Sequence, residues 1–415
     1  MSKRSILIWL IIICALGARV GMVIWAGNAQ ESTTTGGSDT FAYQALADSV
    51  AAHRGFSYEG IPSALRPPVY PLILVFSKFV AGDHYRIFVR LLQAFMGILT
   101  AIICAKTSQK LGGSALIALA AALATPTLIF FSAEILSETV AALIVALFLY
   151  VIVTNRSPIW TGLVIGLGML ERFNLAALAI AYVVYQFAAK PASIAARRTA
   201  LAGLIALAVV SPWIIRNLVV FHGQVIYSTH TGTNLLQGLI MPDGRTQPAE
   251  FKRLEDIQGW QLSDIEANSP RRETFPSEPQ LDRETMAVAL TELRHANLFS
   301  LAARKLGYFW LGFDQMFRTQ ALPPSKRLVR QIGVLAYWFM LAAGIAGWFK
   351  LRLRNADAAR LFLSYVVVVT VAHLPFVMNT RIQAPLIEPV LAILSGLAFP
   401  TLSVSHPATQ KGQEV

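Results

Sequence analysis

Acidic residues and cysteines are scarce in this chain of 415 residues. Only 14% of its residues are charged, whereas 55% are hydrophobic, and the mean hydropathy is +0.55. This composition lies outside the range of soluble globular proteins and within that of membrane proteins. The two cysteines, Cys14 and Cys104, each lie in an apolar run, with no cysteine or histidine at metal-ligand spacing. The sequence therefore indicates neither a disulfide framework nor a zinc site.

The familiar motifs of soluble enzymes are also missing. We find no glycine-rich phosphate loop, no HExxH, no GxSxG and no internal repeat. The formal net charge of +12 comes from short clusters of Lys and Arg between apolar runs, not from one basic face. Such a distribution is typical of membrane orientation, so we expect no nucleic-acid partner.

Long apolar runs dominate what is present. They predict an all-α polytopic membrane protein with about ten transmembrane helices, two of them short. The first run follows Lys3 and Arg4 and has some features of a signal peptide, but its length favours an uncleaved first span. The predicted full-length spans lie near residues 5–25, 86–105, 114–131, 138–154, 200–219, 331–349, 361–377 and 383–400.

The two short spans are predicted at 159–170 and 174–188. Each is marginal alone, and together they flank Glu171, Arg172 and Asn174. We therefore expect a pair of short or broken helices that meet at a polar joint, which is either a ligand contact or only a bend.

The basic residues predict the orientation of these spans. If the spans alternate, the basic clusters all fall on one side, which the positive-inside rule assigns to the cytoplasm together with both termini. The clusters are Lys3/Arg4, Lys106/Lys110, Arg156, Lys190/Arg197/Arg198 and Lys350/Arg352/Arg354/Arg360. The opposite, external side then holds the first loop at 26–85, a short loop at 132–137, the segment 220–330 and the turn near Asn379 to Arg381.

Two apolar stretches on the external side are predicted to be interfacial helices. Residues 66–82 have an apolar core of about a dozen residues, too short to span comfortably, and begin with prolines. In residues 296–317 the apolar pattern is interrupted by Arg304 and Lys305, and counting it as a span would reverse the charge pattern.

These predictions divide the chain into three parts. Residues 1–220 form a transmembrane catalytic module with the first external loop, and 221–330 form a small external segment. Residues 331–415 supply the C-terminal transmembrane helices and a short cytoplasmic tail.

A carboxylate stands at the head of a third short helix, predicted in the stretch GGSDTFAYQALADSV at 36–50. Ser38 is a suitable N-cap, and Asp39 lies in the first turn, where the helix dipole favours a negative charge. Tyr43 and Ala47 follow on the same face. This stretch alone favours helix initiation as the explanation of Asp39 over catalysis.

Five motifs follow one another along the external side. The first loop contains Asp39, Tyr43, Gly55 and Phe56, followed by Arg-Pro-x-x-Tyr-Pro at Arg66, Pro67, Tyr70 and Pro71. The later motifs are SAEILSET at 132–139, GLGMLERFN at 166–174, SPWIIRNLVVFHGQVIYSTHTGTNLLQG at 211–238 and HLPFVMNTRIQAPLIEPVLAIL at 373–394. In this order they resemble the GT-C membrane glycosyltransferases, which include protein O-mannosyltransferases and the lipid A aminoarabinose transferase.

The resemblance implies an enzyme of the bacterial inner (plasma) membrane that moves a sugar from a polyprenyl-phosphate donor to an external acceptor, with inversion. Asp39 would be the general base. Arg66, Arg216 and Arg381, with Arg172 as a further candidate, would bind the donor phosphate. The acceptor is a lipid, a glycan or a protein. The first loop has one acidic residue where some relatives have an adjacent pair, so a divalent cation remains an open question.

Other external residues allow two interpretations each. Snorkelling to the interface is the alternative for the arginines. Glu134 and Glu138, spaced i and i+4, are either acceptor or cation contacts or only helix-end residues. His373 either contacts the phosphate or is a buried neutral histidine, and Tyr43 and Tyr70 are further expected substrate contacts.

The alternative function is a polysaccharide polymerase or ligase, or a flippase for lipid-linked glycans. A flippase needs a cationic cavity but no obligatory carboxylate beside the first span, whereas a transferase depends on that carboxylate.

Overall fold

Only helices and closed barrels satisfy their backbone hydrogen bonds inside a bilayer, and this chain forms helices. The computed structural model describes residues 3–26, 37–58, 60–240, 277–312 and 324–399. In this part, the only paired strands are β1 (Ser57–Tyr58) and β2 (Ile61–Pro62), an antiparallel hairpin that pairs Ser57 with Pro62. The all-α prediction is therefore confirmed.

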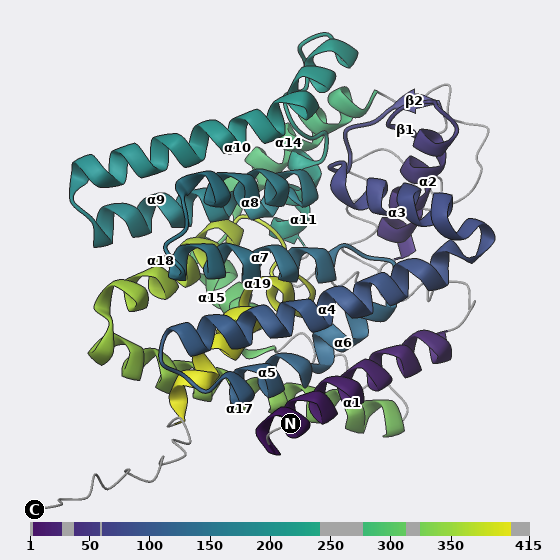
Figure 1. Ribbon diagram of the computed structural model, residues 1–415. Coiled ribbons are helices and arrows are strands. Elements are labelled where there is room, and N and C mark those ends of the chain that lie inside the picture. Colours follow the sequence, from purple (N-terminus) through teal and green to yellow (C-terminus); the bar gives the residue numbers. More distant parts are fainter. Residues whose placement is uncertain (1–2, 27–36, 59, 241–276, 313–323, 400–415) are drawn as a thin grey trace, which may run out of the picture.

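Each predicted span corresponds to a helix or a helix pair (Figure 1). By length and apolarity, six helical stretches among the described residues are candidate spans, or seven if one bent pair counts as a single span. Three shorter apolar helices, α7, α8 and α9, complete the bundle. The helices of the bundle are α1 (Lys3–Ala26), α4 (Tyr85–Lys110), α5 (Ala115–Leu123), α6 (Pro126–Ala133), α7 (Glu138–Val153), α8 (Pro158–Glu171), α9 (Ala177–Ala189), α10 (Ala192–Val220), α17 (Pro324–Arg354), α18 (Ala356–His373) and α19 (Thr380–Ala398).

The span predicted at 114–131 is not a single straight helix. It consists of α5 and α6, which meet at 52°, because Pro126 begins α6 and cannot continue the hydrogen-bond ladder of α5. The buried Arg19 of α1 donates from Nη1 to the carbonyl of Leu123 at the end of α5, over 3.4 Å. A cation at this helix C-terminus satisfies one of the carbonyls that the break leaves without a helical partner.

Small residues bring α8 and α10 into close contact. A Cβ added to Gly166 would lie 2.6 Å from Cβ of Val209 and 3.0 Å from the carbonyl oxygen of Ala206. Such small-residue contacts are typical of helix pairs in membranes. Because α8 ends at Glu171, this packing also fixes the polar joint that follows it.

Short helices α2 (Gly37–Ala51) and α3 (Val69–Ala81) lie at one end of the bundle (Figure 1), and a further short helix, α15 (Leu298–Leu311), packs against α19. Helix α3 buries Tyr70 and Leu74 but exposes Phe76 and Phe79. It continues through the 3-10 turn η1 (Gly82–His84) into α4, as a helical stretch of 42 residues. A stretch of this length exceeds the thickness of a bilayer core, so part of it must lie outside, as expected for 66–82.

The predicted external segment 221–330 contributes α11 (Thr231–Ile240), α14 (Glu278–His295) and α15, and α11 packs against α14. Neither α14 nor α15 is a candidate span. Residues 241–276 and 313–323 of this segment, 27–36 of the first loop and the tail at 400–415 lie outside the described residues. The division into three parts therefore stays a prediction.

The two ends of the bundle differ in charge and contacts. At one end, Lys190 pairs with Asp357 at 3.4 Å, and Arg198 donates to Asn155 Oδ1 at 3.4 Å. Helices α2 and α3 and the hairpin lie at the opposite end from the turns that join α9 to α10 and α17 to α18 (Figure 1). The predicted alternation of the spans thus agrees with the contacts.

Candidate active site

Asp39 lies in the first turn of α2, as predicted, and two arginines neutralise it. Its Oδ1 accepts a hydrogen bond from Arg66, which stands just before α3. Its Oδ2 pairs with Nη2 of Arg381, in the first turn of α19, at 2.6 Å. Only 20% of the Asp39 side chain is exposed. A helix-start residue needs neither contact, so the pairing links this carboxylate to segments far along the chain.

Glu138, the first residue of α7, is the second carboxylate and is fully buried. Its Oε1 accepts a hydrogen bond from Nε of Arg381 at 2.6 Å and lies 3.3 Å from Nη1 of Arg172. Arg381 therefore bridges Asp39 and Glu138. We call the set Asp39, Arg66, Glu138, Arg172 and Arg381 the charged cluster. Its three arginines and two carboxylates leave one positive charge in excess.

The two arginines determine the protonation state of Asp39. Desolvation raises the pKa of this carboxyl group, but the positive charges of Arg66 and Arg381 outweigh it and hold the pKa well below its usual range. Asp39 is therefore ionised at neutral pH. It is also a weak base for as long as both arginines stay paired with it.

Tyr43 lies one turn after Asp39 and is buried. Its hydroxyl is 3.1 Å from Oγ of Ser137, and the guanidinium of Arg66 lies 5.8 Å from its ring centre. Burial raises the pKa of Tyr43, so the phenol stays protonated at neutral pH. Tyr43 therefore belongs beside the charged cluster, as the sequence predicted.

Tyr70 and Glu134 are placed differently. The Tyr70 hydroxyl donates to Oε1 of Gln93 at 2.6 Å, and Nε2 of Gln93 donates to the carbonyl oxygen of Glu134 at 2.6 Å. This chain of contacts ties α3 and α4 to the turn before α7. Both residues thereby help to position Glu138, four residues after Glu134.

His373 uses both of its ring nitrogens within the protein. Nδ1 donates to the carbonyl of Val369 at 2.7 Å, so Nε2 is left to accept from Nδ2 of Asn174 at 3.1 Å. This assignment follows from the hydrogen bonds. The contacts favour the buried neutral histidine over a phosphate ligand.

Arg216 is not brought to the charged cluster. Its guanidinium donates to the carbonyl oxygens of Ser63 at 2.9 Å and Phe56 at 2.5 Å, and to Oδ1 of Asn217 at 2.9 Å. It thereby fastens the loop between α2 and α3 to the end of α10. This geometry supports a bracing role and gives no support to a phosphate contact.

Glu278 makes a second set of contacts that hold this loop, and the sequence did not predict them. Oε2 of Glu278 accepts from the backbone N–H of Ala64 at 3.0 Å and from the hydroxyl of Thr229 at 2.7 Å. These contacts hold the loop two residues before Arg66. Nothing in the local sequence marks Glu278, because the role depends on a contact between residues 214 positions apart.

His230, to which the sequence assigned no role, is also close to the charged cluster. Burial lowers its pKa to about 3, and the charge of Arg66 acts in the same direction while that of Asp39 opposes it. The imidazole is therefore neutral at physiological pH. His230 lies in the motif at 211–238, but the local sequence did not predict that the turn after α10 folds back toward Arg66.

The charged cluster is a poor site for a divalent cation. Both oxygens of Asp39 and Oε1 of Glu138 are paired with arginines, whose positive charges repel a metal ion. Among the described residues, no group of three or more His, Cys, Asp or Glu side chains is placed to hold one.

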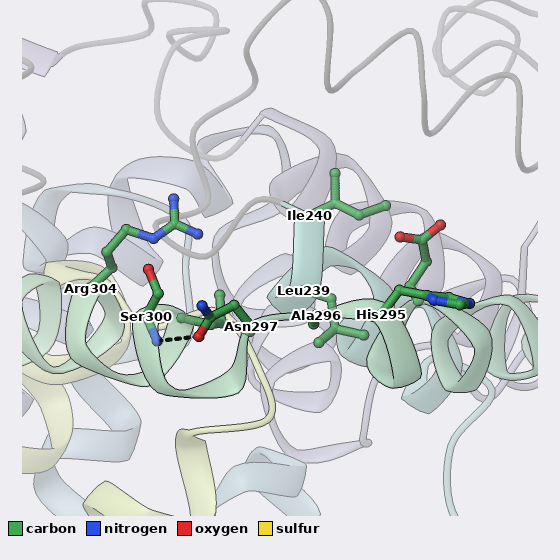
Figure 2. Close-up of a pocket in the computed structure, with 9 residues that line it drawn as sticks. Leu239, Ile240, His295, Ala296, Asn297, Ser300 and Arg304 are labelled. Carbon is green, nitrogen blue, oxygen red and sulfur yellow. Dashed lines mark hydrogen bonds between the residues drawn. The ribbon is translucent and has the colours of Figure 1, made fainter.

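A separate cleft of about 360 Å³ lies where α11, α14 and α15 meet. In Figure 2, Arg304 and Ser300 of α15 lie on one side of the view and Ile240 and His295 on the other. No residue of the charged cluster lines this cleft, so the two features are distinct.

The sequence of this chain matches one protein family over the region that carries much of the site. The family model for dolichyl-phosphate-mannose-protein mannosyltransferases matches residues 65–215, which contain Arg66, Glu138 and Arg172. No curated protein sequence matches the chain significantly.

Among solved structures, the chain is similar to the oligosaccharyltransferase AglB from Archaeoglobus fulgidus, in complex with an inhibitory peptide and a dolichol-phosphate. The TM-score is 0.52 at 14% identity, over 96% of this chain and 50% of that one. ArnT from Cupriavidus metallidurans, bound to undecaprenyl phosphate, gives a TM-score of 0.44 at 14% identity, over 96% of this chain and 78% of that one. The resemblance to the GT-C membrane glycosyltransferases is confirmed. This chain spans about half the length of AglB, so the GT-C fold is shared while the reaction of the whole enzyme is not thereby carried over.

The charge of Asp39 predicts a pH-dependent stability difference. Because its pKa in the folded protein is lowered, its contribution to stability is complete above the unfolded pKa of about 3.9 and is lost as the pH falls through the folded value. We expect Asp39→Asn to be less stable than the wild type by roughly 2 kcal/mol near pH 7. The difference should narrow below about pH 4. Thermal unfolding of both proteins in one detergent, between pH 3 and pH 8, measures it. An equal difference at every pH would show that the ion pairs do not stabilise this fold.

Proposed function

We propose that this protein is a glycosyltransferase that moves a sugar from a polyprenyl-phosphate donor to an acceptor on the external face of the membrane. The charged cluster supports this function most directly. It combines a carboxylate able to accept a proton with three arginines and one uncompensated positive charge. A glycosyl phosphodiester carries one negative charge, so it complements the cluster.

The reaction follows from these groups. Asp39 accepts the proton of the acceptor as the acceptor atom forms a bond to the anomeric carbon of the sugar. The bond from that carbon to the phosphate oxygen breaks, and its electron pair leaves with the polyprenyl phosphate. Arginines stabilise the charge that develops on the leaving oxygen. Attack on the face opposite the phosphate inverts the anomeric configuration.

Arg66, Arg172 and Arg381 are assigned to the donor phosphate. All three are partly exposed, at 21%, 15% and 24% of their side chains, so a ligand can reach them. A phosphate there competes with Asp39 for Arg66 and Arg381. Loss of either pair raises the pKa of Asp39, so donor binding strengthens the base. The dolichol-phosphate bound to AglB, and the dolichyl-phosphate donor in the name of the matching family, belong to the same ligand class.

Residues 26–85 and 220–330 are proposed to face the outside, which is the periplasm if the membrane is a bacterial inner membrane. The gathering of basic residues at the opposite end of the bundle supports this orientation. In a protein lacking Cys14 and Cys104, a cysteine at the exposed Ser277 should react with an impermeant thiol reagent in intact cells. A cysteine at Asn355, at the basic end, should react only after the membrane is opened. The reverse pattern would overturn the orientation.

Transfer itself is tested with a panel of labelled polyprenyl-phosphate sugars and purified protein. We expect label to leave at least one of these lipids in the presence of membrane extract as the acceptor source. Asp39→Asn should reduce turnover by about a hundredfold or more while donor binding is retained. Unchanged turnover in this variant would remove Asp39 as the base. Binding of the lipids without any transfer would favour a flippase.

The phosphate site is tested with bare undecaprenyl phosphate. Arg172→Gln and Arg381→Gln should each weaken its binding by about tenfold, because each removes a charge-assisted contact. Arg216→Gln is the matched control, since its contacts are to the loop. It should lower thermal stability but change this affinity by less than about threefold, well below the loss of a charged contact. Equal loss in all three variants would argue that the arginines act only by supporting the fold.

A further inference from the structure

Hydrogen-bond acceptors without partners gather next to the charged cluster. Among the described residues, buried side-chain atoms that lack a partner include Oε1 and Oε2 of Glu171, Oδ1 of Asn174, Oε2 of Glu138 and Oγ1 of Thr139. Buried polar atoms are nearly always paired in folded proteins. All five atoms can accept a hydrogen bond, and they come from only two places, the joint after α8 and the first turn of α7. Within the described part of the chain, two buried donors of the charged cluster, Nε of Arg66 and Nη1 of Arg172, also lack a hydrogen-bond partner. The region therefore offers both acceptors and donors, which suits a ligand that carries hydroxyl groups.

Glu171 is the most unusual member of this group. It ends α8, an apolar helix, and its side chain has no solvent exposure. A ligand therefore reaches its carboxyl group only when the side chains that cover it move. The groups that face its carboxyl are the Ser137 hydroxyl and the charges of Arg172 and Glu138. A carboxyl group buried at the end of an apolar helix is costly even beside the Ser137 hydroxyl and the charge of Arg172, and an apolar residue of similar size would avoid that cost. The fold alone therefore gives no reason for a carboxyl here.

The position relative to the phosphate site indicates what the ligand is. Glu171 directly precedes Arg172, one of the three arginines assigned to the phosphate. On its other side, Ser137 contacts the hydroxyl of Tyr43, one turn from Asp39. In a glycosyl phosphate the sugar ring is joined to the phosphate through one oxygen. Glu171 is thus adjacent to a phosphate arginine and, through Ser137, to the helix turn that carries the base, and a sugar joined to that phosphate has to lie within this neighbourhood.

We propose that Glu171 binds a hydroxyl group of the donor sugar and so takes part in donor selection. This inference rests on the proposed function. A carboxyl group offers an acceptor oxygen whether it is ionised or protonated. The substrate class is a neutral sugar with a hydroxyl group directed at α8. Glu171 contacts neither the phosphate nor the lipid.

The test compares two affinities in each protein variant. One is for bare undecaprenyl phosphate, and the other is for undecaprenyl-phosphate sugars carrying a hexose, an N-acetylhexosamine or a pentose. The ratio of the two measures what the sugar contributes. We expect Glu171→Leu to reduce this ratio by about tenfold for the sugar that the wild type prefers. Affinity for the bare lipid should stay within about threefold, since no phosphate contact is lost.

Two further variants make the result decisive. Glu171→Gln keeps the size and one acceptor oxygen, so it should fold and lose only part of the sugar contribution. If Glu171→Leu does not fold, the ratio for Glu171→Gln decides the question. Glu388→Gln is the matched control, because Glu388 is also a buried carboxyl with an unpaired oxygen but lies in the middle of α19. It should leave the ratio unchanged.

The failure of this inference is distinguishable from that of the proposed function. An unchanged ratio in both Glu171 variants would overturn the sugar contact and leave the transferase assignment intact. A wild-type ratio of one for every sugar would do the same. A wild-type protein that does not bind bare undecaprenyl phosphate would overturn the proposed function and the sugar contact with it.

Discussion

The bridge that Arg381 makes between Asp39 and Glu138 is the interaction on which the site depends. It joins the first turn of α2, the start of α7 and the start of α19, which lie far apart in the sequence. Two carboxylates this close would repel each other without the cation between them. Arg66 in the first loop and Arg172 in the joint after α8 supply the other positive charges of the cluster. The cluster therefore exists only when all of these segments are in place.

Helix packing and hydrogen bonds outside the charged cluster hold these segments in place. The close contact at Gly166 sets the position of α8, and with it the joint that carries Arg172. Arg216 and Glu278 hold the loop that leads to Arg66, one from α10 and the other from α14. The segment that carries α14 thus supports the site through Glu278. Glu278 therefore connects that segment to Ala64, two residues before Arg66.

The sequence predicted the membrane class, the helices and the position of Asp39, because apolar runs and helix-start residues are local patterns. It also selected Arg66, Arg172 and Arg381 through motif order. It did not separate these from Arg216, since a phosphate-binding arginine and a loop-bracing arginine look alike at a helix end. The sequence predicted one continuous span at 114–131 because the apolar run is long, although Pro126 within it indicates the break. The role of Glu278 depends on a tertiary contact alone, so the sequence could not predict it.

The paired state of Asp39 has a consequence for the order of events in the proposed reaction. An ionised carboxylate that stood free beside the membrane surface could activate water as readily as an acceptor. Here the two arginines that suppress its basicity are the same ones assigned to the donor phosphate. The base therefore gains strength only as the phosphate takes those arginines over. Donor binding then comes before proton transfer, which limits the time during which an activated base faces water. One constraint, the shared use of Arg66 and Arg381, accounts for both the resting structure and the protection of the donor.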